Sequence, residues 1–275
     1  MRAVLGIDAA WTLTEPSGVA VVAESSDGWR LAGVGSSYQR FYCLADPARQ
    51  AELRPSGSEA DAVQSISCAS RLCGGAIDLI AVDMPLARTP ITGRRISDNA
   101  VSRAYGARQC GTHTPNALRP GPVSENLRDG FAAAGYPLLT TRLAPHGLIE
   151  VYPHPALVEL AGASTRLPYK ISRVRSYWPR ATPSERRERL LLEWRKIVEL
   201  LEQEITGVRA ALPLPAIVAS GIDLKAFEDA LDAVICAWVA ISALEDWAKP
   251  YGDENSAIWV PSGALNARRT TPACH

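Results

Sequence analysis

The chain has 275 residues, of which 47% are hydrophobic and 21% charged, and its 29 basic side chains balance its 29 acidic ones. This composition is typical of a folded protein and excludes extended disorder. The uncharged apolar stretch from Ala233 to Leu244 is shorter than the roughly 18 residues of a membrane-spanning helix, so we expect no membrane protein. Asp8 interrupts the first apolar run too early for a secretory signal, which favours the cytoplasm. With no repeat or linker, a single domain over residues 1–275 is expected.

The first part of the chain predicts three strands, a helix and a fourth strand. Apolar runs at 3–9 and 18–23 flank a polar loop and predict a hairpin. Partial alternation predicts a third strand within 29–42. Helical spacing over 57–73 ends at two glycines and predicts a helix, and the apolar run 77–82 predicts the fourth strand. A proline shortly afterwards ends that strand, because proline cannot continue the hydrogen-bond ladder.

A long arginine-rich insertion, about residues 84–149, follows the fourth strand. It contains eight arginines against three acidic residues and predicts only short helices, near 97–107 and 123–134. A second basic segment, 166–195, contains eight arginines and one lysine against three acidic residues. Basic segments on an acidic framework favour a protein that binds phosphates or other anions. A solvated surface explains the same arginines without any ligand.

The remaining elements complete an α/β pattern. A fifth strand is predicted at 148–152, followed by a helix at 153–161 that carries proline in its first turn. Charged residues with leucines on one side predict a helix at 183–205. The most apolar helix, at 224–248, is expected to close the domain.

Four aspartates fall where a sheet and its covering helix would bring them together. Asp8 ends the first predicted strand, and Asp83 follows the fourth. Asp229 and Asp232 are three residues apart and share one face of the last predicted helix. Carboxylates that lie together repel one another unless a cation sits between them, so the simplest explanation is bound Mg²⁺ or Mn²⁺. Two such ions can activate a water and stabilise the leaving oxygen in phosphodiester cleavage.

Other side chains are candidates for the same site, each with an alternative explanation. Glu150 interrupts an apolar strand and points either at the carboxylates or at solvent. Lys170 either contacts a phosphate or is a surface lysine, and Trp11 either stacks on a base or packs as a core or lid residue. The insertion offers three candidates for charge-driven contacts to nucleic-acid phosphates, Arg94, Arg95 and Arg103.

Several motifs together resemble one known family. They are Gly6-Ile7-Asp8, Pro16-Ser17-Gly18, Val82-Asp83-Met84-Pro85-Leu86, Arg95 with Asp98 and Arg103, Glu150-Val151-Tyr152-Pro153-His154-Pro155, and Asp229-Ala-Leu-Asp232-Ala. Over residues 3 to about 248 the chain resembles the predicted RNase H-like nucleases of domain of unknown function family 429. The resemblance implies an RNase H-like mixed sheet flanked by helices, with metal ligation by Asp8, Asp83 and one or both of the two later aspartates. The last motif also resembles the final helix of Holliday-junction resolvases of the RuvC type.

One departure from the RNase H pattern concerns the first helix, where classical RNase H proteins supply a glutamate and Glu59 has no supporting motif. The sequence also lacks the signatures of P-loop, α/β-hydrolase and zincin enzymes. The expected function is therefore a metal-dependent nuclease with nucleic acid as partner. Two alternatives stay open: a phosphotransferase of the actin-like or sugar-kinase type, and a non-enzymatic binding module with the same fold.

Overall fold

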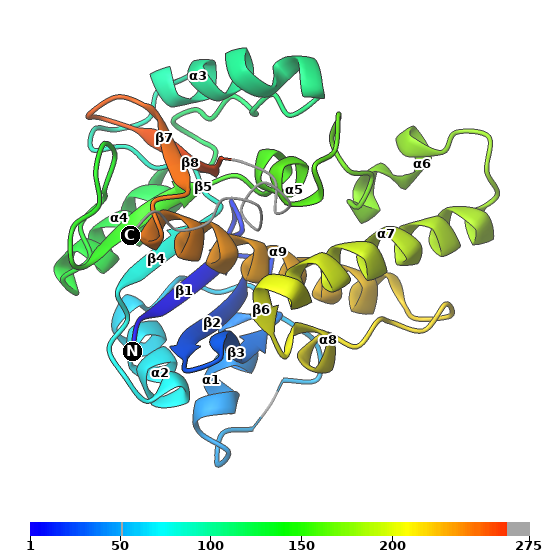
Figure 1. The fold of residues 1–275 in the computed structure, drawn as a ribbon, viewed down its shortest axis with the longest axis horizontal. Coiled ribbons are helices and arrows are strands. Elements are labelled where there is room, and N and C mark those ends of the chain that lie inside the picture. Colours follow the sequence, from blue (N-terminus) through cyan, green and yellow to red (C-terminus); the bar gives the residue numbers. More distant parts are fainter. Residues whose placement is uncertain (51, 263–275) are drawn as a thin grey trace.

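The computed structural model describes residues 1–50 and 52–262, and within them the strands form one mixed sheet of eight strands (Figure 1). The strand order across the sheet is β6-β3-β2-β1-β4-β5-β8-β7. The strands are β1 (Ala3–Asp8), β2 (Gly18–Ser25), β3 (Gly28–Gly35), β4 (Leu79–Val82), β5 (Gly147–Val151), β6 (Ile205–Thr206), β7 (Ala248–Gly252) and β8 (Ala257–Pro261).

Helices cover both faces of this sheet (Figure 1). They are α1 (Tyr38–Ala45), α2 (Ala62–Cys73), α3 (Ile96–Tyr105), α4 (Pro122–Ala133), α5 (Pro153–Ala161), α6 (Val174–Tyr177), α7 (Pro183–Glu204), α8 (Val208–Ala211) and α9 (Gly221–Leu244). Val4 and Ala81 pack in a core with α5, α7 and α9. Leu5 and Val82 point to the opposite face and pack in a second core with α1, α2 and α4. None of the helices in the described part of the chain is long and apolar enough to cross a membrane.

The centre of the sheet places β1 between an antiparallel and a parallel neighbour. It pairs with β2 in antiparallel register and with β4 in parallel register. Strands β4 and β5 are also parallel, as are β5 and β8. The prediction that the first and fourth strands are neighbours is confirmed. Because parallel strands end at the same edge, the residues after β1 and β4 meet there.

Two glycines allow α9 to lie directly on the central strands. A Cβ atom at Gly6 of β1 would overlap the carbonyl oxygen of Ala233, and one at Gly18 of β2 would overlap the carbonyl oxygen of Asp229. The backbone of α9 therefore touches both strands. This close approach places the acidic first half of α9 beside the end of β1.

Most predicted elements are confirmed, with shifted ends. The helix predicted at 153–161 is α5, and that predicted at 183–205 is α7. The helix predicted at 57–73 begins only at Ala62, because the Asp61 side chain accepts from the backbone N–H of Gln64 and caps it.

The third strand, expected within 29–42, is confirmed as β3. It ends at Gly35, because Ser37 caps a helix that was not predicted, α1, by accepting from the Arg40 backbone N–H. One prediction was wrong. The last helix does not close the domain: α9 ends at Leu244, and the β7–β8 hairpin follows and extends the sheet. Within the arginine-rich segment, the predicted short helices are α3 and α4.

Candidate carboxylate site

The site begins with Asp8 and Asp83 at one edge of the sheet. Asp8 is the last residue of β1 and Asp83 directly follows β4, where its backbone N–H donates to the Ile7 carbonyl at 2.9 Å. Alternation along β1 puts Asp8 on the α9 face with Val4 and Gly6. On α9, the buried Cys236 thiol has its pKa raised by burial and by the charges of Asp83, Asp8 and Asp232. The two strand-end carboxylates therefore face α9.

Three acidic side chains of α9 are buried beside this edge, and two lysines form ion pairs with them. The carboxylate of Asp232 accepts from the Tyr169 hydroxyl at 2.8 Å and pairs with Lys170. Lys170 also lies 3.6 Å from Glu228, while Lys225 pairs with Glu228 at 3.2 Å and with Asp229. The α9 carboxylates thus have cations supplied by the chain itself.

Lysine pairing leaves one oxygen of the α9 cluster unsatisfied. Oδ2 of Asp229 is buried without a hydrogen-bond partner. Burial raises the pKa of Asp229 to about 6, although Lys225 opposes the shift. For Lys170 the neighbouring charges outweigh burial. Burial alone would lower its pKa, but Asp232, Tyr169 and Glu228 raise it well above its usual value.

Asp8 and Asp83 differ from the α9 acids because no lysine forms an ion pair with them within the described residues, although the charge of Lys170 opposes the rise in both pKa values. Neither side chain makes a hydrogen bond or ion pair with the described part of the chain. Burial raises the pKa of Asp8 well above its usual value, and the charge of Asp232 raises it further. Burial likewise raises the pKa of Asp83 to about 7. These two carboxylates are the least compensated charges at the edge.

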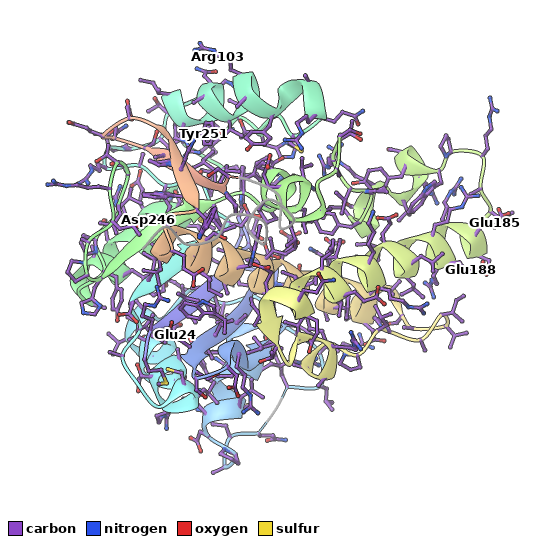
Figure 2. All side chains as sticks on the ribbon, viewed as in Figure 1. Glu24, Arg103, Glu185, Glu188, Asp246 and Tyr251 are labelled. Atoms are coloured by element: carbon purple, nitrogen blue, oxygen red, sulfur yellow. The ribbon has the colours of Figure 1, made fainter. Side chains whose placement is uncertain are left out.

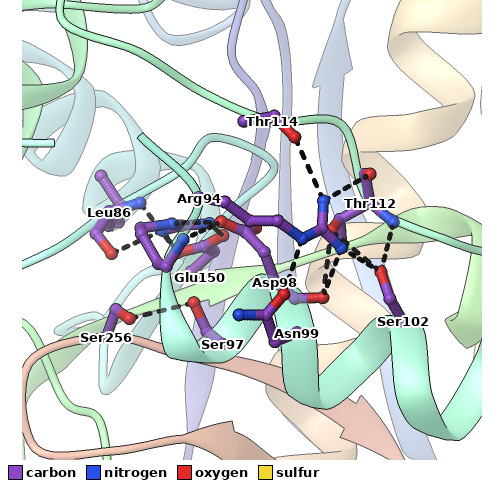
Figure 3. A network of polar contacts seen from close by, with 11 residues as sticks. Leu86, Arg94, Ser97, Asp98, Asn99, Ser102, Thr112, Thr114, Glu150 and Ser256 are labelled. Atoms are coloured by element: carbon purple, nitrogen blue, oxygen red, sulfur yellow. Dashed lines mark hydrogen bonds and ion pairs between the residues drawn. The ribbon is translucent and has the colours of Figure 1, made fainter. Parts of the chain in front are cut away.

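Glu150 is neither a member of this group nor a solvent-facing residue. It lies in register with Val82, whose side chain packs on the face opposite α9. Both of its carboxylate oxygens accept from Arg95, at 2.6 and 2.7 Å, and the Leu86 backbone N–H donates to it at 2.8 Å. Arg95 also donates to both oxygens of Asp98, so one buried guanidinium holds two buried carboxylates (Figure 3).

The three insertion arginines predicted to contact phosphate lie in different environments. Arg94 donates to the side chains of Asn99, Ser102 and Thr114 and so ties the loop after α3 to that helix (Figure 3). Arg95 is buried in the pairs with Glu150 and Asp98. Arg103 projects from the outer side of α3, away from the sheet (Figure 2). The three side chains do not form one patch.

Two adjoining cavities open at the strand ends. One has a volume of about 270 Å³ and includes Asp83, Glu150, His154, Lys170 and Glu228 in its lining. The other, of about 470 Å³, is lined by Asp8 and Arg119 among others. Three residues line both, Trp11, Asp83 and His113. We call these two cavities together the cleft.

Trp11 is half-buried in this cleft. Its ring lies 5.9 Å from the guanidinium carbon of Arg119. An aromatic face and a cation thus flank the entrance to the strand-end carboxylates.

The sequence model of one family matches residues 6–256, which is most of the chain. Its description is "Protein of unknown function (DUF429)". The chain belongs to this family. A search of curated proteins returned no match.

In this DUF429 member the sequence analysis missed three residues that shape the site. Lys225 could have been found from its spacing, because it precedes Glu228 and Asp229 by three and four residues on one helix. Tyr169 and Arg166 carry no such local signal, since only the fold brings the segment before α6 to α9 and the cleft.

Metal ligation by Asp8, Asp83, Asp229 and Asp232 stays a prediction for this DUF429 member. Among residues 1–50 and 52–262, no group of three or more His, Cys, Asp or Glu side chains is arranged to hold a metal ion. Lys170 and Lys225 pair with the α9 carboxylates. Within the described residues, Asp8 and Asp83 and Oδ2 of Asp229 stay without an ion-pair or hydrogen-bond partner.

Proposed function

We propose that this protein is a metal-dependent hydrolase of phosphodiester bonds in nucleic acid, with Mg²⁺ or Mn²⁺ held by Asp8 and Asp83. The observation that carries the proposal is the pair of uncompensated carboxylates at adjacent strand ends, facing a cleft. The neighbouring central strands and the helix packed across them support an RNase H-like fold, as the family resemblance implies.

The donor atoms of this pair fit such an ion. Mg²⁺ prefers oxygen ligands and is usually bound by one or two carboxylates, with water and substrate phosphates completing its shell. Asp8 and Asp83 supply two carboxylates that form no ion pair within the described residues. Binding of such an ion therefore does not require a third protein ligand. Asp229 and Asp232, predicted as ligands from the sequence, instead remain with Lys225 and Lys170 in this proposal.

The chain's own residues account for binding and orientation. When bound, the ion would activate a water and stabilise the leaving oxygen of the phosphodiester. Asp8 and Asp83 hold it at the edge of the sheet, and α9 fixes their position because it packs on Gly6 without an intervening side chain. Lys170 places positive charge next to the carboxylates, where a phosphate approaches. Trp11 offers a ring on which a base can stack, and Arg119 a charge for the backbone.

A melting series tests the metal site. Mg²⁺ or Mn²⁺ alone should raise the melting temperature, because an ion that binds only the folded state stabilises it. Asp8→Asn and Asp83→Asn should each abolish that rise. The matched control is Asp27→Asn, an exposed aspartate in the β2–β3 turn, which should respond to metal like the parent protein.

The same series separates the nuclease from the nucleotide-binding alternative. A kinase-type protein meets Mg²⁺ chiefly through nucleotide phosphates, so ATP with Mg²⁺ would stabilise it strongly while metal alone would do little. Strong stabilisation by ATP with Mg²⁺, together with no stabilisation by Mg²⁺ or Mn²⁺ alone, would contradict the nuclease proposal.

Turnover is the second test. Labelled single-stranded and duplex DNA and RNA should be cleaved with Mn²⁺ or Mg²⁺ and stay intact in EDTA. Asp83→Asn should reduce cleavage to background, while Asp27→Asn should leave it unchanged. Cleavage that survives both EDTA and Asp83→Asn would contradict the proposed site.

A further inference from the structure

The wall of the cleft beyond Asp83 carries cations that have no partner in the protein. The Arg166 guanidinium is half-buried and makes no hydrogen bond or ion pair with the described residues, and its Nε atom is buried without a partner. Arg173 lines the same cavity with an exposed side chain that likewise has no partner among those residues. Burial of the Arg166 Nε–H without a partner is costly, so its position on the cavity wall indicates an acceptor from a bound ligand.

A buried histidine beside these arginines is also unsatisfied. His154 of α5 is 6% exposed, lines the cavity, and has an Nδ1 atom without a hydrogen-bond partner. Burial and the charges of Arg166, Lys170 and Arg173 lower the pKa of His154 well below its usual value. The imidazole is therefore neutral and offers one N–H donor without adding charge.

The acids of the same cavity do not compensate these arginines. Glu150 and Asp98 are saturated by Arg95, and Glu228 is paired with Lys225 and Lys170. Asp83 is the remaining acid of the lining. Arg166 and Arg173, together with the neutral His154, thus line the cationic side of the cavity, and Asp83 lines its acidic side.

We infer that Arg166 and Arg173, with His154, form a binding site for the phosphate group of a nucleotide. Guanidinium groups match phosphate oxygens in a bidentate geometry. The cavity of about 270 Å³ lies near the lower end of small-molecule pockets, roughly 300–1,000 Å³, and so suits one nucleotide unit. The inference deepens the proposed function, because a phosphate held here would place the neighbouring phosphodiester at the strand-end carboxylates.

Binding is measured without metal, in EDTA, with inorganic phosphate, 5′-AMP and adenosine as probes. Inorganic phosphate and 5′-AMP should raise the melting temperature, and calorimetry should give saturable binding. Adenosine should bind much more weakly, because it lacks the phosphate. Equal binding of adenosine and 5′-AMP, or no response to either phosphate-bearing probe, would overturn the inference.

Variants locate the site. Arg166→Gln and Arg173→Gln should each weaken 5′-AMP binding about tenfold or more, since each removes a charge-assisted hydrogen bond. The 5′-AMP affinity of Arg166→Lys should lie between those of the parent and Arg166→Gln, because lysine keeps the positive charge but lacks the paired N–H donors of the guanidinium. The matched control is Arg30→Gln, an exposed β3 arginine in register with Ala23, at the end of the sheet opposite Asp8.

The controls make each outcome decisive. If Arg166→Gln does not fold, the exposed Arg173 provides the test. Loss of binding in Arg30→Gln equal to that in Arg173→Gln would show a general charge effect and refute the site. Asp83→Asn should keep 5′-AMP binding while losing metal-dependent cleavage. A protein that binds 5′-AMP through Arg166 but cleaves no nucleic acid would retain this inference and remove the proposed function.

Discussion

Two groups of carboxylates lie close together where β1, β4 and β5 end, and the protein compensates them in opposite ways. In the first group, here the paired cluster, Arg95 satisfies Glu150 and Asp98 through bonds of 2.6 to 3.0 Å, and all three residues are buried. In the second, here the open pair, Asp8 and Asp83 have no protein partner within the described residues, and their pKa values are raised.

The contrast separates structural from functional acids. A buried carboxylate that is fully paired anchors segments distant in sequence, as Glu150 does for the start of α3. A carboxylate left uncompensated costs stability and persists most often where a ligand or reaction needs it. Sequence alone does not distinguish Glu150 from Asp8 and Asp83, because all three are acids at or near the ends of apolar strands.

Removal of the shared cation should have the largest effect. Arg95→Met leaves two buried carboxylates without their cation and should reduce the free energy of unfolding by about 3–5 kcal/mol. Urea denaturation measures the change. A loss below about 1 kcal/mol would mean that the paired cluster does not hold α3 in place.

Separation of α9 from the open pair should have the next largest effect. Gly18→Ala inserts a Cβ atom against the Asp229 carbonyl and should cost about 2–3 kcal/mol through overpacking. Gly221→Ala on the same helix meets no atom within 4 Å and should change stability by less than about 1 kcal/mol. Equal urea midpoints for the two variants would show that the close packing is not required.

Relief of the open pair should stabilise the metal-free protein. The pKa of Asp83 is about 7 in the fold against 3.8 as the ordinary value, so the folded state holds its proton longer and stability falls as pH rises from about 4 to 7. Asp83→Asn removes this loss. In EDTA at pH 8 the free energy of unfolding of Asp83→Asn should exceed that of the parent by about 2 kcal/mol. This is less than the full pKa shift implies, because the Asp83 side chain is partly exposed.

The pH dependence itself is the check on that gain. Urea titrations between pH 4 and 8 should show the parent and Asp83→Asn diverging as pH rises, while Asp27→Asn follows the parent. Parallel curves for Asp83→Asn and the parent across this range would contradict the raised pKa.

The smallest effect is expected at the exposed neighbour of Arg95. Arg94→Gln removes hydrogen bonds to Asn99, Ser102 and Thr114 at the surface and should cost about 1 kcal/mol or less. Limited proteolysis should detect a looser loop after α3. A loss comparable to that of Arg95→Met would show that burial does not set the difference between adjacent arginines.

Local pattern was sufficient for most elements and for the two strand-end aspartates. Apolar runs and helical spacing located β1, β4, α5 and α7, because these signals depend on residues near one another in sequence. The β7–β8 hairpin was missed, because β7 contains a proline and a lysine, which argue against a strand in a sequence pattern. The structure tolerates both residues because β7 lies at the edge of the sheet.

Contacts between residues far apart in the sequence could not be predicted from local sequence patterns. Glu150 could not be assigned a face, because β5 is buried throughout and its neighbours are apolar on both sides. Its partner, Arg95, is 55 residues away, and Lys170 is 62 residues from Asp232. Nothing in the spacing connects these pairs.

The sequence by itself determined which residues can carry chemistry here: acids placed directly after apolar strands, and four aspartates in recognisable positions. Tertiary structure alone decided which of them are compensated. Packing of α9 on Gly6 and Gly18, and the approach of Lys170 and Arg95 from distant segments, give ion-pair partners to Asp232 and Glu150. Within the described residues they give none to Asp8 or Asp83. The physical reason is that Coulomb interactions depend on distance in space, and the fold, not the spacing of residues along the chain, sets that distance.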